Sequence, residues 1–222
     1  MSFDVTPDAY TRFMGVYSER LAVQFVELLD LRSGQRALDV GCGPGVLTAQ
    51  LADRLGAADV VAIDPSPPFV EAARHRIPGV EVHEGSAEDL PFPDDGFDLA
   101  VAQLVVHFMS DPVAGLAQLA RVTRPGGLVA ANVWDHAGIG GPLTTFWGAV
   151  HDVDPKAIDE SALPGTREGQ LVRLFAEAGL SDLQSGSITV TVGFDSFDEW
   201  WEPYEMGVAG RLLRRRTGRP RS

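Results

Sequence analysis

The sequence predicts an α/β fold: a mostly parallel β-sheet with helices on both faces. Two observations support this class. Short apolar segments of strand length alternate with amphipathic segments of helix length along most of the chain. The 222 residues are also 45% apolar, which is enough for one sizeable hydrophobic core. Strands that alternate with helices pair in parallel, because each crossover helix returns the chain to the same end of the sheet.

The alternation begins with a helix at residues 18–30, where apolar side chains recur at helical spacing after Ser18, a suitable N-cap. Strands and helices then follow one another as far as residue 133. The strands are expected at 36–40, 59–63, 80–83, 98–102 and 128–133, and the helices at 45–55, 67–76 and 112–122. The segment 98–102 is nearly all apolar, which is typical of a strand buried on both faces.

The last third of the chain predicts a helix and a late strand. A helix is expected at 166–178, with Thr166 as N-cap and a glycine after its end. Residues 188–192 alternate apolar side chains with threonine, which indicates a strand. Two segments interrupt this pattern, the Gly- and Pro-rich residues 135–165 and the aromatic residues 194–206. Such irregular stretches in a compact domain often form lids over a binding site, so we expect helical and loop lid segments there.

Charge is unevenly distributed along the chain. The formal net charge is −13, but the last 12 residues carry six arginines and no acid, so residues 1–210 carry −19. An acidic body disfavours binding to a phosphate backbone, and no nucleic-acid partner is expected. Residues 211–222 are interpreted as a solvated basic tail, with a nucleic-acid or membrane patch as the alternative.

The single cysteine, Cys42, excludes an intramolecular disulfide and a four-cysteine zinc site within one chain. No metal site is predicted. The longest apolar stretch, at 97–109, is too short to span a bilayer, and no signal peptide is visible at the N-terminus. We therefore expect a cytoplasmic protein without a membrane span.

The most informative motif is the run LDVGCGPG at residues 38–45. It predicts a buried strand that ends in the carboxylate of Asp39 and then turns on three glycines. Glycine lets the backbone approach a ligand closely and adopt dihedrals that a Cβ forbids. The turn lies at the carboxyl edge of the predicted sheet, where open α/β sheets bind ligands.

Two kinds of ligand could occupy this turn, a dinucleotide or a sulfonium cofactor. A dinucleotide site has the pattern G-x-G-x-x-G, and here Val46 stands where the third glycine belongs. Asp39 would also repel a pyrophosphate, whereas it would attract an ammonium or sulfonium group. Asp64 ends the next predicted strand, where a carboxylate can accept both hydroxyls of a ribose, although it could instead cap the helix at 67–76. The residues thus favour the sulfonium cofactor, a positively charged ligand that contains adenosine.

Four motifs in order make the chain resemble the class I S-adenosylmethionine-dependent methyltransferases, in the group related to ubiquinone- and menaquinone-biosynthesis and other small-molecule methyltransferases. They are LDVGCGPG at 38–45, VVAIDPS at 60–66, GSAEDLPFPDDGFDLAVAQLVVHF at 85–108 and RVTRPGGLVAANVW at 121–134. The resemblance covers about residues 10–195. It implies a Rossmann-like three-layer sandwich with a seven-stranded, mostly parallel sheet. Residues 182–194 would form the antiparallel hairpin at the end of that sheet.

The resemblance also implies S-adenosylmethionine as cofactor and a set of binding residues. Asp39 and the turn Gly41-Cys42-Gly43 would hold the methionine part, and Asp64 the ribose. The remaining cofactor residues would be Pro65 beside the adenine, Ser86, Ala87 and Glu88 at its edge, Gln103 near the reacting methyl, and Tyr17 closing over the cofactor. The family most often has aspartate where Ser86 stands, and Glu88 could substitute for it.

In functional terms, the resemblance implies methyl transfer by in-line displacement to a small, largely apolar molecule. The alternative is a catalytically silent S-adenosylmethionine-binding regulator or scaffold. His107 and His136 are the candidate general bases because histidine titrates near neutrality, although packing is the favoured role for His107. Aromatic residues of the irregular segments would form an apolar roof over the cofactor: Trp134, Phe146, Trp147, Trp200 and Trp201.

The expected organisation is one methyltransferase domain at residues 1–210, with an N-terminal helical cap at 1–33 and a lid insertion at 135–165. The basic tail follows at 211–222. The sequence does not decide between a monomer and a homodimer. A nucleic-acid methyltransferase is disfavoured by the charge, and by Gln103-Leu104-Val105-Val106, which stands where an Asn/Asp-Pro-Pro-aromatic run would be expected.

Overall fold

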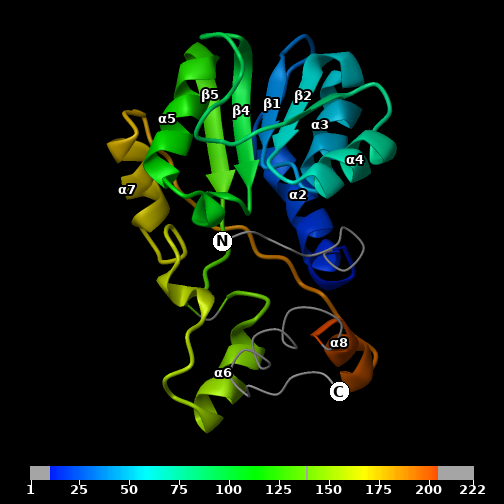
Figure 1. Ribbon diagram of the computed structural model, residues 1–222, viewed down its shortest axis with the longest axis vertical. Helices are drawn as coiled ribbons and strands as arrows, with labels where there is room; N and C mark the ends of the chain where they lie inside the picture. The colour runs from blue at the N-terminus through cyan, green and yellow to red at the C-terminus, as the bar shows by residue number, and fades with distance from the viewer. Residues whose placement is uncertain (1–10, 139, 205–222) are drawn as a thin grey trace.

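The computed structural model describes residues 11–138 and 140–204, and within them a five-stranded parallel sheet forms the centre of the molecule (Figure 1). The spatial order of the strands is β3-β2-β1-β4-β5, and all four pairings are parallel. The strands are β1 (Ala37–Val40), β2 (Val60–Asp64), β3 (Glu81–Glu84), β4 (Phe97–Gln103) and β5 (Thr123–Asn132). The order reverses between β1 and β4, and such a switch point is where open α/β sheets form ligand crevices.

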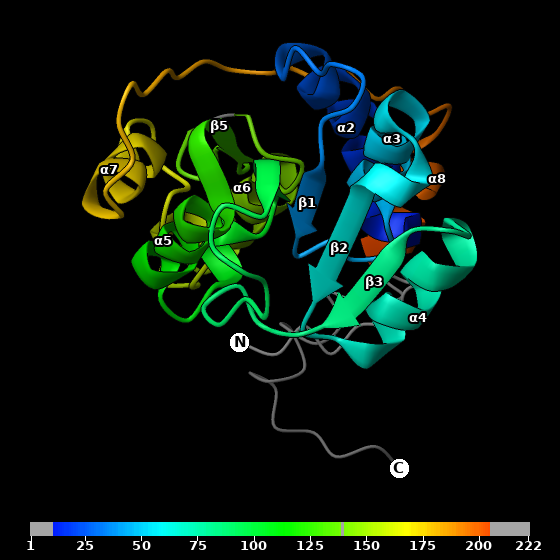
Figure 2. The same ribbon diagram turned by 90° about the horizontal axis from the view of Figure 1, so that it is seen from above.

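Helices cover both faces of the sheet, as the alternation predicts. The helices α2 (Val16–Leu28), α3 (Val46–Leu55) and α4 (Pro67–Arg76) enclose one apolar core with the sheet. On the opposite face, α5 (Pro112–Val122) and α7 (Gln170–Glu177) enclose a second core (Figure 2). The α/β class and the three layers are therefore confirmed, and the bounds of α4 and α5 are those predicted.

The start of α2 differs from the prediction. A π-helix at Thr11–Gly15 leads directly into α2, so the helix begins at Val16 and its N-cap is Gly15. Ser18 is not the N-cap; it is buried inside the helix, and its hydroxyl donates to the carbonyl oxygen of Gly15 at 3.4 Å. Apolar residues continue N-terminal to Ser18, and burying them extends the helix beyond the polar residue that seemed to start it.

Two other boundaries also differ from the predictions. The strand β5 begins at Thr123 and includes the Pro-Gly-Gly segment, at the cost of a register irregularity between Phe97 and Leu99 on β4. The helix α7 begins at Gln170, after Gly169 in the left-handed region at φ 75°. Thr166 does not cap it, because its hydroxyl donates at 2.7 Å to the carbonyl oxygen of Leu163 in the preceding loop.

The prediction of seven strands is wrong for the described chain, in which the sheet has five. Residues 182–194, expected as the antiparallel hairpin, form no strand and run alongside α2. Their backbone carbonyls at Thr189 and Thr191 accept hydrogen bonds from the side chains of Gln24, at 3.3 Å, and Arg20. Alternating Thr and Ile/Val side chains predict an extended amphipathic segment. They do not predict whether a neighbouring strand or a helix will supply the hydrogen bonds to its backbone.

The two irregular segments form a helical and loop layer beyond the carboxyl ends of the strands (Figure 1). The first contains α6 (Thr144–Val153) and a 3₁₀ turn at Glu160–Ala162, and the second contains α8 (Phe197–Pro203). Their aromatic rings pack with those of the N-terminal helix. We call this set the aromatic cluster: Phe13, Tyr17, Trp134, Phe146, Trp147, Trp200, Trp201 and Tyr204.

The predicted domain end at residue 210 and the basic tail at 211–222 lie outside the described residues. Among the helices that are described, none combines the length and the apolar character that crossing a membrane requires.

Candidate functional site

The glycine turn after β1 has the strained geometry that its sequence predicts. Gly41, Gly43 and Gly45 have φ values of 71°, 53° and 82°, in the left-handed region that side chains disfavour. A Cβ on Gly41 would lie 2.3 Å from Cγ2 of Val105. The backbone N–H groups of Gly41 and Cys42 donate to the carbonyl oxygen of Ile63 at 2.8 and 3.1 Å. These bonds fix the turn against the end of β2.

Asp39 is the buried carboxylate of the site, with only 1% of its surface exposed. Its Oδ2 atom accepts a hydrogen bond from the Thr48 hydroxyl of α3 at 2.6 Å. Burial raises the pKa of Asp39 to about 7; the Thr48 bond lowers it, and the charge of Asp64 raises it further. A cation bound beside Asp39 would favour its ionised form.

Asp64, at the end of β2, is held by two backbone N–H groups. Its Oδ2 accepts from Gly43 at 2.8 Å, and its Oδ1 accepts from Ser66 at 2.9 Å. Burial raises the pKa of Asp64, and these two bonds lower it. The N-cap of α4 is Ser66, so the alternative in which Asp64 caps this helix is wrong. Each carboxylate oxygen keeps a lone pair for a ligand hydroxyl, and Pro65 is exposed beside it.

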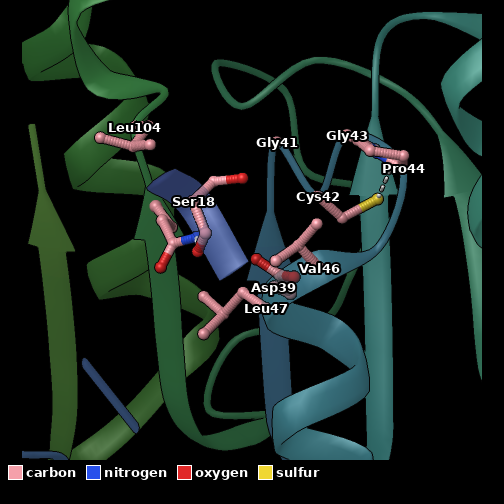
Figure 3. Close-up of a pocket in the computed structure, with 10 residues that line it drawn as sticks. Ser18, Asp39, Gly41, Cys42, Gly43, Pro44, Val46, Leu47 and Leu104 are labelled. Carbon is pink, nitrogen blue, oxygen red and sulfur yellow. Dashed lines mark hydrogen bonds between the residues drawn. The ribbon is translucent and has the colours of Figure 1, made fainter. Parts of the chain in front are cut away.

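A pocket lies at this edge of the sheet and joins residues that are distant in sequence (Figure 3). Its walls come from α2, the end of β1 with the glycine turn, α3 and the end of β4. The lining residues are Ser18, Asp39, Gly41, Cys42, Gly43, Pro44, Val46, Leu47, Gln103 and Leu104. The structure therefore brings together Asp39, the turn and Gln103, as predicted from their strand ends.

The residues of this region that were not predicted as site residues include Ser18, Thr48 and Leu104. Thr48 could have been found from the sequence, because it is a polar residue in the helix that directly follows the turn; the structure buries it completely. Nothing in the sequence pointed to Leu104, whose φ of 59° is unusual for leucine and follows from the tertiary structure. Ser18 was assigned to a cap, and its place in the pocket wall follows from the N-terminal extension of α2.

Gln103 contacts the N-terminal helix α2, and Tyr17 lies on that helix. The side-chain amide of Gln103 donates from Nε2 to the carbonyl oxygen of Ser18 at 3.3 Å, and its buried Oε1 has no partner. Tyr17 is half-buried, with its ring centroid 6.4 Å from that of Trp134 in an edge-to-face contact. Tyr17 thus belongs to the aromatic cluster, next to Ser18 in the pocket wall.

The predicted adenine edge forms a tightly bonded loop. Glu88 accepts hydrogen bonds at Oε1 from the backbone N–H groups of Ser110 at 2.7 Å and Asp111 at 3.3 Å, and at Oε2 from the Ser86 hydroxyl. Partial burial raises the pKa of Glu88, but these bonds outweigh it and lower the pKa overall. Ala87 is buried in the core beneath them. Glu88 holds the loop together, so an adenine contact from Ser86, Ala87 or Glu88 stays a prediction.

The two candidate bases, His107 and His136, are neighbours although 29 positions separate them. Their ring centroids lie 5.9 Å apart in an edge-to-face arrangement. His107 is 3% exposed and its buried Nδ1 has no partner; burial lowers its pKa to about 3, with a further contribution from the charge of His136. Burial also lowers the pKa of His136, while the charges of Asp159 and Asp135 oppose that shift.

The comparisons with known proteins agree with this geometry. A family model described as a methyltransferase domain matches residues 38–131, from the first residue of the glycine-turn motif to the next-to-last residue of β5. The chain carries an S-adenosylmethionine-dependent methyltransferase domain. Since the site offers a buried carboxylate for a cation and a second one with free lone pairs for a ribose, its residues fit this cofactor.

Proteins similar to this methyltransferase domain include named enzymes. One is the 2-methyl-6-phytyl-1,4-hydroquinone methyltransferase 2 of Oryza sativa, 32% identical over 173 residues, covering 77% of this chain and 46% of that protein. Another is the demethylmenaquinone methyltransferase of Beutenbergia cavernae, 37% identical over 131 residues, covering 59% and 52%.

Among solved structures, a methyltransferase from Thermotoga maritima described as a possible histamine N-methyltransferase aligns with a TM-score of 0.59 and 25% identity. The alignment covers 78% of this chain and 76% of that one. The chain spans about half the length of the curated relatives it matches first. The methyltransferase fold of the domain is therefore shared, and the likeness to the curated relatives covers only part of their length.

Proposed function

We propose that this protein transfers the methyl group of S-adenosylmethionine to a small, largely apolar acceptor. The observation that carries the proposal is the pocket in which Asp39, the glycine turn and Gln103 meet beside the aromatic cluster. When bound, the cofactor supplies an electrophilic methyl group on a sulfonium. The chain's task is then to align two molecules, which can lower a barrier greatly without covalent catalysis.

Cofactor binding is assigned to the residues at the strand ends. Asp39 attracts the positive charge of the methionine part, and the turn Gly41-Cys42-Gly43 lets the backbone come close to it. Asp64 accepts the ribose hydroxyls, and Pro65 flanks the adenine. Gln103 lies between the cofactor pocket and the aromatic cluster, and Tyr17 covers this side.

The acceptor is assigned to the side of the aromatic cluster. The sulfonium loses its charge as the methyl leaves, so a largely apolar roof favours the transition state over the ground state. Trp134, Phe146 and Trp147 are buried and Trp200 and Trp201 are half-buried in such a roof. The relatives named above act on a phytyl hydroquinone and a demethylmenaquinone, which supports an apolar acceptor. The charge of −19 over residues 1–210 opposes a nucleic-acid acceptor.

His107 and His136 are assigned different tasks on this side. A pKa of about 3 makes His107 a weak base but keeps its ring neutral, so it acts through hydrogen bonding at Nδ1. His136 is less buried and faces the charges of Asp159 and Asp135, which favour its protonated form. We therefore assign proton removal to His136 rather than to His107.

Titration calorimetry with S-adenosylhomocysteine tests the proposal. We expect the Asp39→Ala and Asp64→Ala variants to lose affinity by at least tenfold, since each removes a charged partner of the ligand. Asp53→Ala, on the exposed face of α3, is the matched control and should bind like the unchanged protein. Unchanged affinity in both site variants would overturn the assignment. Binding without methyl transfer to any acceptor would favour the silent regulator or scaffold instead.

A further inference from the structure

Unpartnered polar atoms are concentrated where β4 and β5 end. Within the described chain, the buried side-chain atoms without a hydrogen-bond partner include Oε1 of Gln103, both amide atoms of Asn132 and Nε1 of Trp134. Trp134 itself is only 8% exposed. Buried polar groups in folded proteins are nearly always paired, so a concentration of unpaired ones indicates groups that bind something else.

The sheet places these three side chains together. Asn132 is the register partner of Gln103 across the β4–β5 ladder. Trp134 follows Asn132 by two residues, just after β5 ends, and belongs to the same buried cluster as Leu104, the neighbour of Gln103. The ladder continues through the backbone N–H of Leu104, which donates to the carbonyl oxygen of Asn132 at 3.0 Å. Gln103 also lines the cofactor pocket, so this polar set borders the cofactor.

The surroundings of the polar set are apolar and partly aromatic. The ring of Tyr17 contacts Trp134 edge-to-face, and Leu104, Phe13 and Met14 belong to the same buried cluster. A second tryptophan of this cluster shows that the indole N–H of Trp134 lacks a hydrogen-bond acceptor. Nε1 of Trp147 donates to the carboxylate of Glu160 at 2.8 Å, whereas the corresponding atom of Trp134 donates to nothing.

The chemistry of the free atoms selects the group that they bind. Trp134 and the Asn132 amide nitrogen can only donate, and the amide oxygens of Asn132 and Gln103 can only accept. A carboxylate would leave both oxygens unpaired, and an ammonium group would leave the indole N–H unpaired. A neutral hydroxyl both donates and accepts, and matches the set. We propose that Asn132, Trp134 and Gln103 bind a hydroxyl group on a planar apolar ring of the acceptor.

This inference rests on the proposed function and is tested on the full chain saturated with S-adenosylhomocysteine. The probes are 2-naphthol, which carries the hydroxyl, and naphthalene, which lacks it. In ¹⁵N spectra of the indole groups, 2-naphthol should shift the Nε1–H resonance of Trp134 and leave that of Trp147, already bonded to Glu160, in place. Naphthalene should not produce the hydrogen-bond shift at Trp134.

Two variants separate the hydroxyl contact from general packing. Trp134→Phe keeps a ring and Asn132→Ala removes the amide, and each should weaken 2-naphthol binding about tenfold, the effect of one hydrogen bond. Naphthalene affinity should stay the same, and S-adenosylhomocysteine affinity shows that each variant is folded. If a variant does not fold, the resonances of the unchanged protein decide.

Equal affinity for the two probes, or a Trp134 resonance that stays in place, would overturn the hydroxyl site while cofactor binding stands. A protein that does not bind S-adenosylhomocysteine at all would instead overturn the proposed function.

Discussion

The Thr48 hydroxyl donates to the Asp39 carboxylate over 2.6 Å, and the backbone of the same threonine also hydrogen-bonds to this carboxyl. These neutral donors do not replace all the water that a carboxylate loses on burial. The loss of hydration raises the pKa of Asp39 to about 7. Asp39 is thus held in a state that favours a bound cation over the empty pocket.

We predict that Asp39→Asn stabilises the protein without ligand at high pH. The carboxyl pKa is about 7 in the folded state and 3.8 for an isolated side chain. The folded protein therefore binds more protons between these values, and its stability falls as pH rises from 3.8 to 7. Above pH 7 the cost is complete, at about 2–4 kcal/mol, and Asn avoids it.

Urea unfolding at pH 4 and pH 8 checks this prediction. The gain in free energy of unfolding should be present at pH 8 and nearly absent at pH 4. The same variant should bind S-adenosylmethionine more weakly, since it has lost the charge. A variant that is less stable at pH 8 would contradict the buried, poorly compensated carboxylate.

Cofactor binding should release a proton below pH 7. S-adenosylmethionine brings a positive charge beside Asp39, which lowers the carboxyl pKa and expels the proton. Affinity should then rise up to tenfold per pH unit towards pH 7 and level off above it, because the carboxyl is already ionised there. Calorimetry in two buffers of different ionisation enthalpy counts the protons released. Asp39→Asn is the control, and release that persists in it would assign the proton to another group.

The glycines of the turn should differ sharply in their tolerance of a methyl group. In Gly41→Ala the Cβ meets Val105 at 2.3 Å and the φ is 71°, so we expect a loss of at least 2–3 kcal/mol in stability. Gly43 has φ 53° but open space around its Cβ, so Gly43→Ala should cost only about 1–2 kcal/mol, from backbone strain alone. Thermal unfolding measures both, and Val105→Ala should partly rescue Gly41→Ala. Equal losses would mean that the contact with Val105 is easily relieved.

Arg20 and Gln24 should determine how well the 182–194 segment is protected. Their side chains supply the hydrogen bonds to the carbonyls of Thr191 and Thr189, and no strand pairs with that segment in the described chain. The double variant Arg20→Ala/Gln24→Ala should speed amide hydrogen exchange of residues 186–194 severalfold while β4 keeps its protection. Glu27→Ala, exposed on the same helix, is the control. Unchanged exchange in the double variant would show that packing alone holds the segment.

The sequence was most informative where local patterns and tertiary structure agree. The five described strands and the bounds of α4 and α5 follow from apolar periodicity, from proline in the first helical turn and from glycines that end the elements. The glycine turn, Asp39 and Gln103 also meet as expected, because strand ends of a parallel sheet meet at one edge.

Predictions failed where long-range contacts decide the structure. The alternation at 188–192 indicates an extended backbone, but side chains of α2 rather than a neighbouring strand bind its carbonyls. The position of Ser18 depends on apolar residues before it that bury and extend the helix. The pairing of His107 with His136, and the unpaired indole of Trp134, depend on how two loops fold over the strand ends, and no sequence period encodes that.

One wall of the proposed cofactor pocket is the first turn of α2, where Ser18 lies three residues after the end of a π-helix at Thr11–Gly15. The rest of α2 is fastened into the core by Leu21, Phe25 and Val26. π-Helical turns often occur at functional sites, and this one adjoins the pocket wall. We therefore expect the proposed cofactor to enter and leave the pocket where this end of the helix opens.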